Sequence, residues 1–245
     1  MKRHIPNIIT LGNLFCGVMS IRMAVFGRWW EAVLFVFLGI VCDFLDGLIA
    51  RLLHVTSPLG KELDSLADVV TSGVVPGFFL FMMLWEDCTI TWLKYTAFLI
   101  PMFAAYRLAK FNLDERQHHS FLGLPTPANT LFWTGIVMWS EECDLPFSGF
   151  TGLAGMDTSC WVFAFCDTGY IVMALVSILL NILMISELPM FSLKFANLSW
   201  RDNRLRYIFL LVCLLLVVLF GYACLPMIVV WYVLLSLITC RKAKQ

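Results

Sequence analysis

Charged side chains are scarce in this chain. Of its 245 residues only 14% are Asp, Glu, Lys or Arg, whereas 60% are hydrophobic. A soluble globular protein carries about 25% charged and about 45–50% apolar residues. The 17 basic and 17 acidic residues balance, so there is no net positive charge to attract nucleic acid. This composition excludes a disordered chain and a basic nucleic-acid binder, argues against a soluble enzyme, and predicts a polytopic membrane protein.

The sequence also lacks paired cysteine motifs and a clear cleavage site for a signal peptide. The nine cysteines are scattered and form no CxxC pair. Cys88, Cys143, Cys160 and Cys166 fall in segments expected on the external side of the membrane, where a disulfide is possible, although sequence does not determine the pairing. No clear small-residue cleavage site follows the basic N-terminus, so we expect residues 8–27 to be retained as a helix.

Long apolar runs fill most of the chain. A helical span needs about 20 mostly apolar residues, and eight segments meet this length approximately. They leave no room for a large soluble domain, so we expect an all-α fold. The predicted spans are 8–27, 31–50, 66–85, 90–110, 124–140, 168–187, 206–221 and 223–240.

The basic residues predict the orientation of these spans. Fourteen of the 17 lysines and arginines fall on one side of the membrane if all eight spans cross it. Positively charged segments face the cytoplasm, so both termini are predicted to be cytoplasmic. The segment 141–167 holds five acids and no Lys or Arg, and we expect it outside.

Four aspartates stand out because they lie at the ends of apolar helices. Asp43 and Asp46 are three residues apart, and Asp64 and Asp68 are four apart, so each pair shares a helix face. Both pairs flank the short loop 52–59 and can converge at the cytoplasmic membrane surface.

Converging carboxylates repel one another, and an acid within a membrane costs at least about 2.5–3.5 kcal/mol. Protonating all four is improbable, and Arg51 offers one positive charge. Ligation by oxygen alone favours Mg²⁺ or Mn²⁺, so we predict two divalent cations, which would also attract phosphates. The small residues Gly47, Ala50 and Gly60 would leave space for a ligand beside them.

The pattern Asp43-x2-Asp46-Gly47-x2-Ala50-Arg51-x8-Gly60-x3-Asp64-x3-Asp68 resembles the signature of the CDP-alcohol phosphotransferase family, with every position filled. The segments at 6–17, 60–69, 107–112 and 123–127 resemble one branch of it, the membrane-embedded phosphatidylserine synthases. The resemblance implies a six-helix core over residues 1–190, with a cytoplasm-facing cavity for CDP-diacylglycerol and often a homodimer. Residues 191–245 then form a basic loop and two additional helices without assigned chemistry.

The resemblance also implies residue roles. The four aspartates would hold the two cations, and Asp68 would be the general base. Contacts to CDP-diacylglycerol are expected from Gly47, Arg51 and Ser57, with the small residues Ala50 and Gly60 beside them. Arginine suits this role because its guanidinium pairs bidentately with phosphate.

The acceptor implied by the branch is L-serine, whose carboxylate needs a cationic partner. Arg107 and Lys110 are candidates, and positive-inside anchoring explains them equally well. Asn7, Thr10 and Asn13 recur every three residues on the first helix and either line the cavity or bond to neighbouring helices.

The expected activity is therefore transfer of a phosphatidyl group from CDP-diacylglycerol to L-serine in the plasma membrane of a prokaryote, with no nucleic acid involved. Inositol or glycerol phosphate as acceptor remains open. A membrane prenyltransferase is disfavoured because its Asp motifs usually lie on separated helical regions. A cation transporter is disfavoured because its acids would be expected near the membrane midplane, and four aspartates fit an intramembrane aspartyl protease poorly.

Overall fold

The computed structural model of the chain describes residues 4–55, 57–85, 90–113, 121–140, 167–190, 200–221 and 224–243. This part is helical except for its connections and one pair of two-residue strands, β1 and β2. In chain order the elements are α1 (His4–Val25), α2 (Trp29–Leu52), α3 (Pro58–Asp68), the π-helix η1 (Val69–Val74), α4 (Val75–Trp85), the 3₁₀-helix η2 (Leu93–Phe98), α5 (Leu99–Leu113), β1 (Phe121–Leu122), α6 (Thr126–Ser140), α7 (Asp167–Ile185), β2 (Pro189–Met190), α8 (Trp200–Phe220) and α9 (Cys224–Ala243).

All eight segments predicted as membrane spans coincide with helices. Within the described residues, four helical stretches are long and apolar enough to cross a membrane: His4–Val25, Trp29–Leu52, Pro58–Trp85 and Asn203–Phe220. The chain is therefore an all-α polytopic membrane protein, as predicted. The largest difference concerns the third span, which begins at Pro58 rather than at residue 66. The cysteines proposed for a disulfide, Cys88, Cys143, Cys160 and Cys166, lie outside the described residues.

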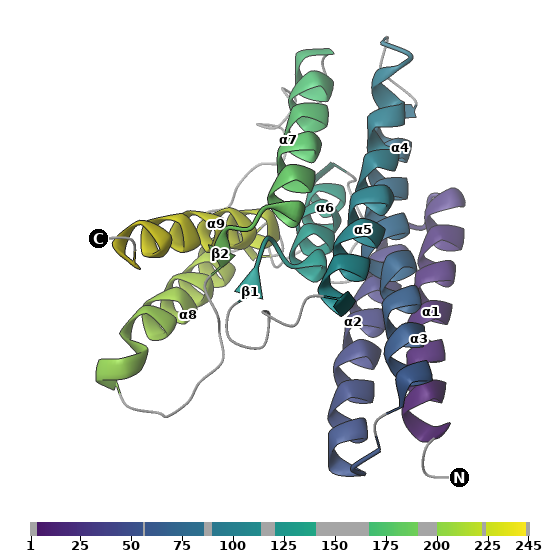
Figure 1. Ribbon diagram of the computed structural model, residues 1–245. Helices are drawn as coiled ribbons and strands as arrows, with labels where there is room; N and C mark the ends of the chain where they lie inside the picture. The colour runs from purple at the N-terminus through teal and green to yellow at the C-terminus, as the bar shows by residue number, and fades with distance from the viewer. Residues whose placement is uncertain are drawn as a thin grey trace.

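The helices that carry the aspartates belong to a group of upright helices. Figure 1 shows α1, α2, α3 with α4, α5 and α7 with their axes roughly aligned, whereas α8 and α9 project to one side. α9 is packed on α6, where a Cβ atom on Gly135 would lie 2.5 Å from Cδ of Pro226. This close approach joins the last two helices to the rest of the protein.

A tight turn sets α1 and α2 side by side. Gly27 has a φ of +68°, a left-handed conformation that glycine adopts without steric cost. The amide of Gly27 donates to the carbonyl of Ala24 (3.0 Å), and that of Arg28 donates to Met23 (2.9 Å). These bonds satisfy carbonyls at the end of α1, as in a glycine C-cap. The chain reverses directly into α2, so the two helices are in contact along their length.

The helix that carries Asp64 and Asp68 begins with a strong start signal. Ser57 is its N-cap, and its hydroxyl accepts a hydrogen bond from the amide of Gly60 at 3.0 Å. Pro58 occupies the first helical turn, where a proline costs no hydrogen bond. This polar turn fixes where α3 begins, and with it the positions of both aspartates.

A π-helical segment, η1, follows Asp68 immediately. Its side chains and carbonyls are engaged by neighbouring helices: Thr71 Oγ1 donates toward the carbonyl of Asn13 (3.3 Å) in α1, and Thr130 Oγ1 in α6 donates toward that of Ser72 (3.1 Å). π-helical turns are rare and occur frequently at functional sites. Here the segment ties the aspartate-bearing helix to both α1 and α6.

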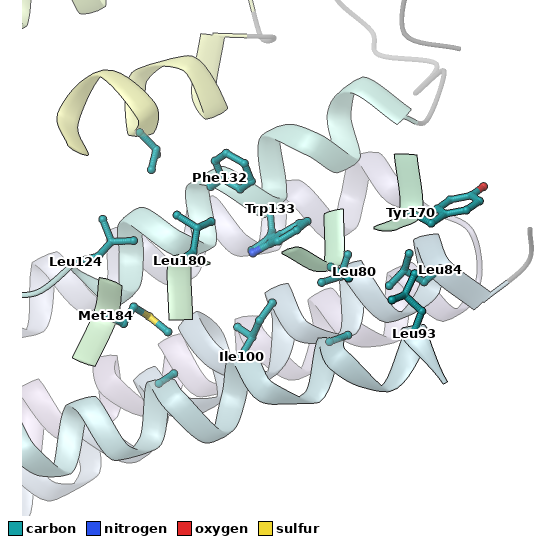
Figure 2. Packing of buried hydrophobic residues seen from close by; sticks show 14 of the residues in the cluster. Leu80, Leu84, Leu93, Ile100, Leu124, Phe132, Trp133, Tyr170, Leu180 and Met184 are labelled. Carbon is teal, nitrogen blue, oxygen red and sulfur yellow. The ribbon is translucent and has the colours of Figure 1, made fainter. Parts of the chain in front are cut away.

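The main apolar core lies away from the aspartates. Figure 2 shows Leu80 from α4, Ile100 from α5, Trp133 from α6 and Met184 from α7 among the side chains that fill the space between these helices. Burial of such side chains from several helices stabilises their relative positions through close packing. This core therefore holds α4, α5, α6 and α7 together, and α4 continues the helix that carries Asp64 and Asp68.

Two glycines of α1 provide a stability test. A Cβ on Gly17 would lie 2.9 Å from Thr71 Oγ1 and 3.3 Å from its Cα, whereas a Cβ on Gly12 meets only Cys42 Sγ, at 3.7 Å. Overpacking costs about 1–3 kcal/mol, and Ala is otherwise favoured over Gly in a helix by about 1 kcal/mol. We expect Gly17→Ala to lower the melting temperature in detergent, and Gly12→Ala, the matched control, to leave it unchanged or raise it. Equal melting temperatures for the two variants would contradict the close packing at Gly17.

Candidate active site

Two helices bring the four predicted aspartates together. Asp43 and Asp46 lie in the last turns of α2, and Asp64 and Asp68 lie in α3. One carboxylate oxygen each from Asp43, Asp64 and Asp68 lies within 4.8 Å of the other two. Asp46 is 6% exposed, and its carboxylate lies close enough to that of Asp68 for the two to repel each other. The i+3 and i+4 spacings thus place all four acids on facing helix surfaces, as expected from the sequence.

Helix α1 supplies hydrogen-bond donors to two of these acids. Thr10 Oγ1 lies 2.5 Å from Asp46 Oδ2, and Asn13 Nδ2 lies 3.2 Å from Asp68 Oδ1. Thr10 and Asn13 are themselves buried, at 3% and 1% exposed. Two of the three polar residues predicted on α1 therefore orient the aspartates directly.

The donor set at this cluster fits a divalent cation. Among the described residues, the buried Asp64 Oδ1 and Asn13 Oδ1 atoms have no hydrogen-bond partner. Three converging carboxylates repel one another strongly, because their surroundings are partly shielded from water. Oxygen ligands of this kind are those that Mg²⁺ and Mn²⁺ prefer. Asp43, Asp64 and Asp68 are therefore suited to hold a metal ion.

A cavity of about 530 Å³ opens beside the cluster. Asp46 and Asp64 border it, while Asp43 and Asp68 are not among its lining residues. The cavity is bounded by the end of α2, the start of α3 and the first turns of α1. Its lining comprises Pro6, Asn7, Thr10, Asp46, Gly47, Ala50, Val55, Ser57, Pro58, Gly60, Lys61 and Asp64.

The small residues predicted at this site lie in the cavity wall. A Cβ on Gly47 would meet no heavy atom within 4 Å, so this side of the cavity is open. At Gly60 a Cβ would lie 3.0 Å from Ser57 Oγ and 3.1 Å from Asn7 Oδ1. Gly60 thus permits the close approach of α1 and the N-cap of α3, and any larger residue would crowd both polar groups.

Two basic residues in the described part of the chain, Arg51 and Lys61, lie at this end of the molecule. Arg51 is exposed and donates from Nε to the carbonyl of Gly47 at 2.9 Å, so its side chain runs back along α2 toward the cavity wall. Lys61 lines the cavity and donates to the carbonyl of Asn112 at 3.2 Å. Lys61 was missed by the sequence reasoning, although its spacing of three from Asp64 places it on the same face of α3.

Arg107 and Lys110 lie apart from this cavity and have different surroundings. Arg107, in α5, is 7% exposed, its Nη1 lies 3.3 Å from Thr126 Oγ1, and its charge interacts with that of Asp68. Lys110 forms an ion pair with Glu187 at 3.2 Å, in which Glu187 is largely exposed. Arg107 is therefore the more buried of the two, and its helix α5 packs against the segment that follows Asp68.

Helix α9 also reaches this region. Tyr232 is close enough to Arg107 for the two groups to interact electrostatically, and its ring packs edge-on against Phe209 of α8 at a centroid distance of 6.1 Å. Nothing in the spacing of residues along the sequence signals this contact, because it depends on how α9 packs against α6.

Comparison with known proteins gives the following matches. The profile of the family described as CDP-alcohol phosphatidyltransferase matches residues 3–161. A Bacillus subtilis protein named CDP-diacylglycerol–serine O-phosphatidyltransferase is 38% identical over 128 residues, which are 51% of this chain and 70% of that protein. Proteins of the same name from Helicobacter pylori and Mycobacterium leprae are 38% and 30% identical, over 50% and 76% of this chain. These alignments span only 52% and 57% of those two relatives.

Proposed function

The chain belongs to the CDP-alcohol phosphatidyltransferase family, as its aspartate motif predicted, and on this premise we propose that it transfers a phosphatidyl group from CDP-diacylglycerol to L-serine. The products would be phosphatidylserine and CMP. The observation that carries the proposal is the convergence of Asp43, Asp64 and Asp68 beside a cavity of about 530 Å³ that Asp46 and Asp64 border. The shared name of the relatives from three bacteria supports serine as the acceptor.

Asp43, Asp46, Asp64 and Asp68 would together hold two divalent cations, Mg²⁺ or Mn²⁺. When bound, such ions bind phosphate oxygens and offset negative charge on a departing phosphate group. The chain's own contribution is to fix the ligands in place: Thr10 holds the carboxylate of Asp46 and Asn13 that of Asp68. Hydrogen bonds that hold metal ligands in place strongly affect the affinity of a site for its metal.

CDP-diacylglycerol would lie in the cavity with its nucleotide and pyrophosphate, while its acyl chains stay in the lipid. Gly47 and Ala50 would leave space for the pyrophosphate, and Gly60 and Ser57 lie beside them in the cavity wall. Among the described residues, Arg51 and Lys61 supply cationic side chains at this end, and guanidinium and ammonium groups both pair with phosphate.

Asp68 would act as general base. It would take the proton from the serine hydroxyl as that oxygen attacks the phosphorus that carries diacylglycerol, and the bond from this phosphorus to the CMP oxygen would break. Holding the hydroxyl, the phosphorus and the base together provides much of the rate enhancement in such reactions. The bond from Asn13 Nδ2 orients the Asp68 carboxylate for this step.

The serine carboxylate would be bound by Arg107. Arg107 is better placed for this role than Lys110. Arg107 is buried beside Thr126, whereas Lys110 is more exposed and is paired with Glu187. Asn7 lines the nucleotide cavity and would contact CDP-diacylglycerol rather than serine.

The active site and both termini would face the cytoplasm of a prokaryotic cell, with the protein in its plasma membrane. The excess of basic residues on one predicted side supports this orientation. Residues 1–190 would be the catalytic core and residues 191–245 the additional segment, and resemblance to the family supports a homodimer. No nucleic acid takes part in the proposed reaction.

The test is acceptor screening with purified protein, CDP-diacylglycerol and Mg²⁺ or Mn²⁺, with CMP release as the readout. We expect CMP release to depend on L-serine and to remain near background with inositol or glycerol 3-phosphate. Turnover with one of those acceptors but not with serine would overturn the acceptor assignment. Metal-dependent cation flux in liposomes without CMP release would favour a transporter, and turnover of an isoprenoid diphosphate would favour a prenyltransferase.

A further inference from the structure

The end of α5 is joined to the first half of α3 by hydrogen bonds. Asn112, in the last turn of α5, donates from Nδ2 to Ser65 Oγ at 2.8 Å. Its backbone carbonyl accepts a hydrogen bond from Lys61 Nζ at 3.2 Å. Ser65 Oγ in turn donates to the carbonyl of Lys61, one helical turn earlier, at 3.2 Å. Asn112 therefore holds one turn of α3 at both ends, through its side chain at Ser65 and through its backbone at Lys61.

Lys61 is the member of this network that reaches the cavity beside the aspartates. It lines that cavity together with Asp64, whereas Asn112 and Ser65 are not among the lining residues. A lysine ammonium has three protons to donate. Within the described part of the chain, Lys61 Nζ makes the one hydrogen bond to Asn112, so the ammonium still has protons to offer an anionic ligand in the cavity.

The contact with Asn112 matters because Lys61 is exposed. A lysine side chain loses about 2 kcal/mol of rotamer entropy when it is fixed in one conformation. A contact that fixes the ammonium group before the ligand arrives removes this cost from binding, which is how preorganisation raises affinity. The carbonyl of Asn112 is such a contact, and the bond from Asn112 Nδ2 to Ser65 keeps that carbonyl beside α3.

The same bonds add little to the packing of α5. This helix is already held by its contacts with the π-helical segment η1 and with α7. The bonds to α3 lie at its end, where Asn112 and Ser65 are only partly buried. Their main effect is therefore on the side chain of Lys61 and not on the position of the helix.

We propose that Asn112 and Ser65 are positioning residues for the donor substrate. They hold the Lys61 ammonium at the cavity wall, where it binds a phosphate oxygen of CDP-diacylglycerol. The proposal rests on the proposed phosphatidyl transfer and adds the residues that prepare one of its phosphate contacts. It gives the end of α5 a part in binding the donor, although no residue of α5 lines the cavity.

A double-mutant cycle tests whether Asn112 acts through Lys61. Lys61→Ala removes a charged donor, and we expect the KM for CDP-diacylglycerol to rise about tenfold or more. Asn112→Ala removes the bond to Ser65 and should raise the same KM about threefold to tenfold, as for a neutral hydrogen bond. The KM for L-serine should be unchanged in both variants. In the Lys61→Ala protein, the further change Asn112→Ala should cause no additional rise.

Variants of Ser65 approach the same bond from its other end. Ser65→Ala removes the acceptor and should reproduce the rise seen for Asn112→Ala, so it decides the matter if that variant does not fold. Ser65→Thr keeps the hydroxyl and should keep a KM near that of the wild type. The matched control is Glu187→Gln, which breaks the exposed ion pair with Lys110 near the same end of α5. Its KM should stay within about twofold of the wild type, because exposed ion pairs contribute little.

The outcomes separate the two proposals. If the wild-type protein releases no CMP with serine, the proposed function fails, and the same cycle measured as the dissociation constant of CDP-diacylglycerol still decides the role of Asn112. If CMP is released but the folded Asn112→Ala and Ser65→Ala proteins keep the wild-type KM for CDP-diacylglycerol, only the positioning role is overturned. A rise for Asn112→Ala that is the same with and without Lys61, or that also occurs in Glu187→Gln, would overturn it as well.

Discussion

Asp68→Asn is expected to reduce serine-dependent CMP release by at least about a thousandfold while the protein remains folded. General base catalysis contributes about 10²–10⁴-fold, and the substitution also removes a carboxylate from the metal cluster. Asparagine has nearly the same shape, and its amide oxygen can still accept the bond from Asn13 Nδ2. The loss should therefore appear in kcat, with binding of CDP-diacylglycerol largely retained.

The matched control for this experiment is Glu62→Gln. Glu62 also lies in α3 but is exposed and is not a lining residue of the cavity, so the same charge is removed from the same helix without touching the cluster. Its activity should stay within about twofold of the wild type, because exposed charges contribute little. An Asp68→Asn protein that kept more than a tenth of wild-type turnover would show that another group accepts the proton.

Removal of divalent cations is expected to have the second largest effect. Chelation with EDTA should abolish CMP release, and Mg²⁺ or Mn²⁺ should restore it. It should also lower the melting temperature, because Asp43, Asp64 and Asp68 repel one another when no cation lies between them. A cation at a hundred times its dissociation constant stabilises the folded state by about 2.7 kcal/mol, so the shift is measurable without substrate.

Variants of the cluster distinguish this site from non-specific cation binding. The shift in melting temperature caused by Mg²⁺ should be lost in Asp43→Asn and Asp64→Asn and retained in Glu62→Gln. A shift of the same size in all three variants would assign the cation effect to another part of the protein. Activity that survives exhaustive chelation would refute the metal requirement itself.

The aspartate cluster was predictable because charge in an apolar helix is rare and helical spacing determines which side chains share a face. The roles of Thr10 and Asn13 were foreseen only as polar positions at a spacing of three; which acid each one contacts depends on how α1 packs on α2 and α3. The membrane span that contains α3 was predicted to begin only at residue 66, although Gly60 and Asp64 were placed on its helix, because the first turns of α3 are polar and a search for apolar runs passes over them.

The contacts that Thr126 and Thr130 of α6 make, and the reach of α9 to Arg107, could not be predicted in the same way. Thr126 and Thr130 occur in a sequence that also suits an ordinary helix start, where Thr and Asn are common. Their significance depends on Arg107 of α5 and on the segment after Asp68, which lie far away in the sequence. Contacts between distant helices carry no local signal in a single sequence.

The π-helical segment after Asp68 has a consequence for how the long helix Pro58–Trp85 is organised. A π-turn closes its hydrogen bond one residue later than an α-turn, so the segment acts as an inserted residue. One residue corresponds to a rotation of about 100° in an α-helix. The half that carries Asp64 and Asp68 is therefore out of phase with the half where Gly77 lies against Pro101 of α5. One continuous helix thereby presents two surfaces in different directions, one facing carboxylates and the other facing apolar helices.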